Sequence, residues 1–72
     1  MKKLLKDYGF NSDQQYFEMI VNSVINGNRT QAKEQFKAMP RKDQKTFIVA
    51  IYAPGWQSGL NYTDKAMFFN LI

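Results

Sequence analysis

The sequence predicts an all-α protein: a compact bundle of four helices preceded by a short N-terminal helix, in one domain spanning residues 1–72. Three observations lead to this prediction. Apolar side chains recur at the three- and four-residue spacing of amphipathic helices. Gly and Pro divide the chain into helix-sized pieces, and capping residues stand where several of those pieces begin.

The first element is expected at 2–8, where Leu4, Leu5 and Tyr8 share one helical face and Gly9 can supply a left-handed C-terminal residue. Because so short a helix is unstable alone, it must dock on the rest of the chain or fray.

The second helix is expected at 13–26. Ser12 and Gln15 form a capping box. Apolar positions then follow the helical rule: Phe17, Ile20, Val21, Val24 and Ile25.

The third helix is expected at 30–38. Its narrow apolar stripe consists of Ala32, Phe36 and Met39, and Pro40 ends it.

The fourth helix is expected at 41–53. Its second half, 47–53, has no polar residue, which indicates a central helix without a solvent face. Its β-branched residues allow a strand instead, but the helix start at 40–46 and the lack of a partner strand favour a helix.

The last helix is expected at 62–71, after a Gly-rich loop at 54–59. Its apolar residues occupy more than one stripe, and a small core covers only one side of a helix. The uncovered side predicts self-association, most simply a homodimer. The residues expected at that contact are Met67, Phe68, Phe69 and Ile72. The alternative is a central helix wrapped by the N-terminal segment and the Trp56 loop.

Positive charge is concentrated between residues 28 and 45, in a set that we call the basic ridge. It consists of Arg29, Lys33, Lys37, Arg41, Lys42 and Lys45. Six cations minus Glu34 and Asp43 give +4, which equals the formal net charge of the chain. A solvated helix face without a partner is the first interpretation of such a ridge. Among partners, the ridge favours an acidic protein surface, with nucleic-acid phosphates as the second candidate.

Aromatic residues outside the apolar stripes are further interface candidates, since Tyr and Trp are enriched at binding hot spots. Trp56, in the loop, is grouped with the basic ridge as partner-binding, although it can also fold back as a lid over the core. Tyr16 lies off the main stripe of its helix.

The chain contains neither Cys nor His. The commonest general base, the commonest zinc ligand and every thiolate site are therefore missing. The carboxylates are scattered and no Gly-rich phosphate loop is present. We therefore expect no enzyme activity, no catalytic residues, no cofactor and no metal. The longest apolar run, 47–54, is too short for a membrane span, and no signal peptide is evident, so a cytoplasmic location is expected.

The segments 25–28, 31–36 and 41–43, followed by Phe47, resemble a helical region that recurs in small accessory proteins of bacteriophages and mobile elements. The resemblance covers about a third of the chain and carries no active-site motif. It implies a phage-encoded cytoplasmic protein that acts on a host or phage macromolecule. The function expected is that of a non-enzymatic protein-binding regulator or inhibitor that occludes a partner's surface. The alternatives are a nucleic-acid-binding accessory protein or transcriptional regulator, and a structural homo-oligomeric component.

Overall fold

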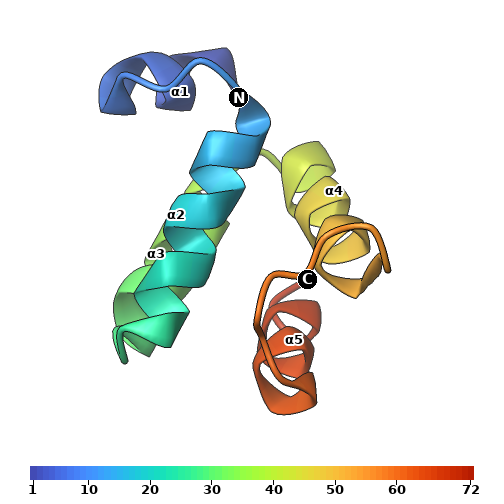
Figure 1. Cartoon of the computed structure of the whole chain (residues 1–72). Coiled ribbons are helices and arrows are strands. Elements are labelled where there is room, and N and C mark those ends of the chain that lie inside the picture. Colours follow the sequence, from blue (N-terminus) through green and yellow to red (C-terminus); the bar gives the residue numbers. More distant parts are fainter.

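The computed structural model describes all 72 residues and contains helices but no strand (Figure 1). The helices are α1 (Lys2–Tyr8), α2 (Asp13–Ile25), α3 (Arg29–Ala38), α4 (Arg41–Tyr52) and α5 (Tyr62–Phe69). The predicted all-α class is confirmed, as is a helix rather than a strand over 47–52. The last helix ends at Phe69, earlier than the sequence pattern indicated. No helix combines the length and the apolarity needed to cross a lipid bilayer.

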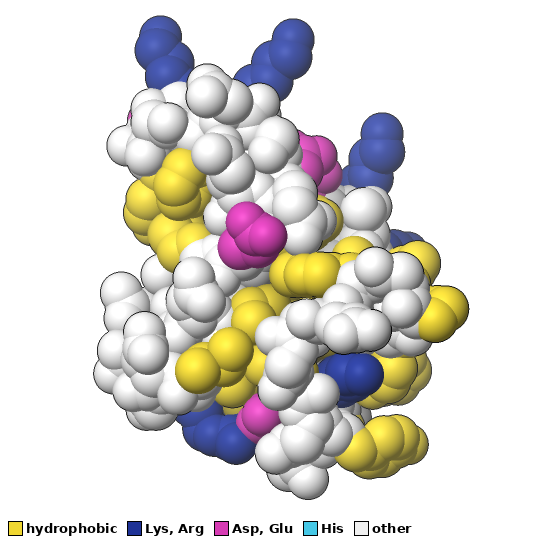
Figure 2. Space-filling model, viewed as in Figure 1, with side chains coloured by type: hydrophobic (Ala, Val, Ile, Leu, Met, Phe, Trp, Pro, Cys, Tyr) yellow, Lys and Arg dark blue, Asp and Glu magenta, His cyan; other side chains and the backbone are white.

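The helices form two pairs, with α1 lying across one end of α2 (Figure 1). α2 and α3 run side by side in opposite directions, and α4 packs against α5. The core fills the space between the two pairs. On the surface, hydrophobic side chains gather beside α1 and α2 and again over α4 and α5 (Figure 2).

Local signals set the ends of the first two helices. The Gln15 amide nitrogen lies 3.4 Å from Ser12 Oγ and the Ser12 amide nitrogen 3.2 Å from Gln15 Oε1, which completes the predicted capping box. Gly9 adopts φ 73°, and the amides of Gly9 and Phe10 donate back to the Lys6 and Leu5 carbonyls at 3.1 and 2.8 Å. This is a Schellman motif. Because Leu5 and its neighbour Leu4 also pack on the core, α1 is docked.

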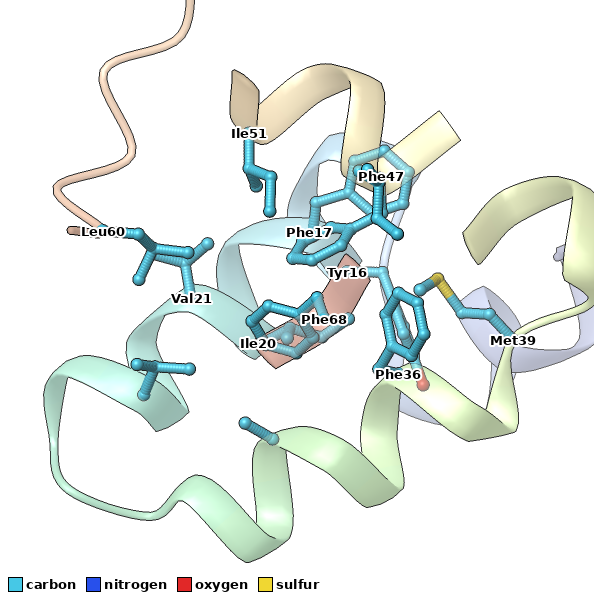
Figure 3. Close-up of a cluster of buried hydrophobic side chains, with 13 residues drawn as sticks. Tyr16, Phe17, Ile20, Val21, Phe36, Met39, Phe47, Ile51, Leu60 and Phe68 are labelled. Atoms are coloured by element: carbon cyan, nitrogen blue, oxygen red, sulfur yellow. The ribbon is translucent and has the colours of Figure 1, made fainter. Parts of the chain in front are cut away.

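Phe47 lies at the centre of an aromatic core (Figure 3). Its ring centroid is 5.0 Å from that of Phe68, 5.3 Å from that of Phe17 and 5.7 Å from that of Phe36. The rings are inclined by 62–79°, the edge-to-face arrangement that aromatic pairs prefer. One side chain of α4 thus contacts a ring from each of α2, α3 and α5.

Tyr16 was an interface candidate because it lies off the main apolar stripe of its helix, and this interpretation is wrong. Its side chain is fully buried, because α1 and α3 cover that side of α2. The Tyr16 hydroxyl donates to the Gln35 carbonyl at 2.8 Å, so the buried polar group is satisfied. Burial raises the pKa of this hydroxyl to about 12, and the neighbouring Tyr8 adds to the shift.

The expectation that the second half of α4 has no solvent face is also wrong. Phe47, Ile48 and Ile51 are buried, but the Val49 side chain is 69% exposed and that of Tyr52 is 42% exposed. The core covers one side of α4, and α5 covers only part of the other. An apolar stripe of α4 is therefore left open beside α5.

Candidate interaction surface

An apolar groove of about 620 Å³ lies between α4 and α5. We call it the α4–α5 groove. All of its lining residues are hydrophobic: Ile48, Val49, Tyr52, Ala53, Tyr62, Ala66 and Phe69. At one end it continues into a smaller hollow that adds Lys45 and Ile72. No other part of the surface combines this size with this composition.

Regular helical spacing builds both walls of the groove. The α4 wall comprises positions 45, 48, 49 and 52, which follow i, i+3, i+4 and i+7, and Ala53 extends this wall directly after the helix. The α5 wall comprises positions 62, 66 and 69, which follow i, i+4 and i+7. Residues at these spacings share one helix face. Each helix therefore has two apolar faces, one used by the core and one turned to the groove.

The groove exposes large apolar side chains to water. Tyr62 is 79% exposed, Val49 69% and Phe69 63%. Their transfer from water to an apolar contact is favourable by about 25 cal/mol per Å². Single exposed apolar residues are common, whereas a contiguous apolar groove is a candidate binding surface.

Positive charge borders the groove. Lys45 lines one end beside Phe69 and Ile72. Lys65 Nζ lies 5.6 Å from the centroid of the Tyr52 ring, within the range of a cation–π contact. No acidic side chain lines either hollow. The groove is therefore apolar at its floor and cationic at its edge.

The two carboxylates of α4 and α5 are directed elsewhere. Asp64 forms an ion pair with the Arg29 guanidinium of α3, and its side chain is only 10% exposed. Asp43 lies 3.7 Å from the Met1 amino group. Since these are the only ion pairs in the chain, the cations Arg41, Lys42, Lys45 and Lys65 have no carboxylate partner.

The basic ridge predicted from sequence is divided by the fold. Arg29 joins α3 to α5 through Asp64 and also approaches Met67 Sδ at 3.8 Å, so it serves the fold. Lys33 is half-buried. The exposed remainder consists of Lys37, Arg41, Lys42 and Lys45, which lie around the α3–α4 corner and along the first turns of α4. Of these, Lys45 reaches the groove.

The predicted self-association residues do not share a face. Phe68 is 0% exposed at the centre of the core, so it cannot provide a surface contact. Met67 is half-buried against the core. Phe69 and Ile72 are exposed and line the groove region. Successive helical residues point about 100° apart, which places Phe68 and Phe69 on different sides of α5.

Trp56 adopts the lid position that is named in its sequence interpretation. Its side chain is half-buried, and its ring centroid lies 6.4 Å from that of Phe47. Leu60, further along the same loop, is buried in the core. The loop between α4 and α5 therefore folds back on the core, away from the α4–α5 groove, whose lining does not include Trp56.

Sequence reasoning did not identify Val49, Tyr52 and Lys65 as site residues. For Val49 and Tyr52 the signal was present in the unbroken apolar run 47–53. The run was interpreted as burial of the whole second half of the helix. A helix can also be apolar on all sides because one face packs on the core and a second face binds another molecule.

A second groove, of about 580 Å³, lies along α2 and α3 and differs in chemistry. Most of its lining is polar, and six residues contribute carboxamides: Gln15, Asn22, Asn26, Asn28, Gln31 and Gln35. Water satisfies such groups readily. The exposure of apolar surface thus singles out the α4–α5 groove.

Three comparisons with known proteins found no match to this chain: no protein-family model, no curated protein and no solved structure. The groove and the charges around it are therefore the features of this chain that bear on its function.

Proposed function

We propose that this chain is a non-enzymatic protein-binding regulator or inhibitor, acting in the cytoplasm by occluding a surface of another protein. The α4–α5 groove is its recognition surface. The observation that carries the proposal is the open groove lined only by hydrophobic side chains. Apolar anchors inserted into such a groove supply most of the binding free energy at protein interfaces.

The surrounding charge favours an acidic partner surface. Lys37, Arg41, Lys42 and Lys45 are exposed and make no ion pair within the chain. Exposed cations of this kind steer an acidic partner and raise the association rate more than the final affinity. The resemblance of residues 25–47 to small phage accessory proteins suggests a host or phage protein as the target.

Affinity capture from a nuclease-treated bacterial lysate tests this proposal. Val49→Glu places a carboxylate in the groove. Ile25→Glu is the matched control, because Ile25 is also an exposed aliphatic residue, 59% against 69% for Val49, and does not line the groove. We expect a protein to be retained by the wild type and by Ile25→Glu and to be lost with Val49→Glu, while circular dichroism shows all three folded.

Equal retention by all three proteins would contradict the groove as the recognition surface. If nuclease removes everything that the wild type captures, nucleic acid is the partner and the proposal is wrong.

A further inference from the structure

We propose that the occupant of the α4–α5 groove is an amphipathic helix of the partner, with acidic side chains beside its apolar face. This inference rests on the proposed function and adds the shape and charge of what is recognised.

The walls of the groove match a third helix. α4 and α5 each present a stripe at three- and four-residue spacing, the pattern that packs against ridges of another helix. Ala53 and Ala66 are small and half-buried, so an incoming backbone can approach closely between the larger side chains. The chain has no strand, so it offers no sheet edge on which an extended peptide could add.

The groove also sets the length of the contact. Along α4 it extends from Lys45 to Tyr52, about 10 Å at 1.5 Å per residue. That distance corresponds to about two helical turns. A partner helix would therefore insert anchors at i, i+3 or i+4, and i+7.

The charges around the groove indicate which residue types flank the apolar face of the partner helix. Lys45 lies at one end of the groove, and Lys65 lies beside Tyr52 at the wall. Neither has a carboxylate partner in the chain, since Asp64 is held by Arg29 and Asp43 lies near the Met1 amino group. Glu or Asp residues flanking the apolar face would complement these cations, whereas Lys or Arg residues there would be repelled.

The same charges argue against a second copy of this chain. A two-fold dimer through the groove would bring identical surfaces together. Both would contribute Lys45 and Lys65, with Arg41 and Lys42 nearby and no free carboxylate on α4 or α5. The formal net charge of +4 per copy adds to the repulsion. An acidic partner surface avoids both the repulsion between facing cations and the repulsion between two positive net charges.

Two synthetic peptides test the proposal. Each has about 16 residues, enough to form a helix, and both share one leucine face. The flanking positions are Glu in the first peptide and Lys in the second. Fluorescence anisotropy with the full chain should give roughly tenfold tighter binding of the Glu peptide at low salt, because several exposed ion pairs each contribute a small factor. The preference should shrink as salt screens these charges.

Two charge variants locate the effect. Lys45→Gln with Lys65→Gln should abolish most of the preference for the Glu peptide. Lys3→Gln with Lys6→Gln removes the same charge from exposed positions on α1 and should leave the preference in place. In NMR spectra of the labelled protein, the Glu peptide should shift amide signals of α4 and α5 and leave those of α2 unchanged.

Equal binding of the two peptides, a preference for the Lys peptide, or shifts confined to α2 and α3 would overturn the inference. Sedimentation showing a dimer that dissociates with Val49→Glu would also overturn it, in favour of a second copy as occupant. If lysate capture depends on Val49 but the peptides show no charge preference, the inference fails while the proposed function stands. If capture is independent of Val49 and neither peptide binds, both fail.

Discussion

Arg29 and Asp64, 35 positions apart in the sequence, form an ion pair that joins the first residue of α3 to the first turn of α5. The Asp64 side chain is 10% exposed, whereas that of Arg29 is 50% exposed. Asp64 is the more buried of the two residues, so its carboxylate depends more on this ion pair than the Arg29 guanidinium does. An acceptor left unsatisfied in such a position costs about 1–3 kcal/mol, and more if it stays charged.

We expect Arg29→Met to lower the free energy of unfolding by about 1–3 kcal/mol, because it leaves the Asp64 carboxylate unpaired. Asp64→Asn should restore part of this loss when it is added to Arg29→Met, since the neutral amide needs no counter-ion. Urea unfolding of the single and double variants measures both effects. An unchanged midpoint for Arg29→Met would show that the pair contributes nothing to stability.

Phe47→Ala should destabilise the fold by about 3–5 kcal/mol, because it opens a cavity among three aromatic rings. In a domain this small that loss is a large part of the total stability. Val49→Ala, two positions away on the exposed face, should change stability by less than about 0.5 kcal/mol. Thermal unfolding of the two variants compares them, and similar losses would contradict the division of α4 into a core face and a groove face.

Phe68 and Phe69 should respond in opposite ways to the same substitution. Phe68→Glu buries a carboxylate in the core and should prevent folding. Phe69→Glu places the charge at the groove surface and should leave the helical circular dichroism signal intact while weakening partner binding. If Phe69→Glu unfolds the protein as Phe68→Glu does, the groove face of α5 is part of the core.

Tyr16→Phe should reveal a pH-dependent contribution. The pKa of this hydroxyl is raised to about 12 in the fold, so the folded state favours the neutral form. The contribution is therefore fully present below about pH 10, the ordinary tyrosine value, and is lost as pH rises toward 12. At pH 8 the variant should be less stable by about 1 kcal/mol, because the Gln35 carbonyl loses its donor.

Between pH 10 and 12 the difference in stability between wild type and Tyr16→Phe should therefore shrink. Urea unfolding at pH 8 and at pH 11.5 is the measurement, and a constant difference would contradict the assigned shift.

Gly9→Ala should loosen α1. Gly9 has φ 73°, where a Cβ costs about 1–2 kcal/mol even though no atom lies within 4 Å of its position. Gly55→Ala is the matched control, since Gly55 is equally open and its φ is not in the left-handed region. Hydrogen exchange should show faster exchange of the α1 amides in Gly9→Ala alone. Unaltered protection would mean that the Schellman turn does not hold α1 in place.

Features that depend on neighbours a few positions away could be predicted from the amino-acid pattern alone. The Ser12–Gln15 capping box and the Gly9 turn both appear in the structure as expected. The stripe of Ala32, Phe36 and Met39 is buried, as its spacing predicted. Backbone hydrogen bonds and caps within a helix connect residues three to five apart, so short-range patterns are sufficient to place helices.

Which apolar faces are covered could not be predicted in this way, because it depends on how whole helices pack against one another. The run 47–53 shows that α4 is apolar on several sides. It does not show that α5 leaves one of these sides open to solvent. Phe68 and Phe69 are chemically identical neighbours with opposite environments. In the sequence Arg29 belongs to the basic ridge, but in the fold α5 places Asp64 beside it and the two residues form an ion pair. Each outcome depends on contacts between segments far apart in the chain, and the packing of whole helices determines those contacts.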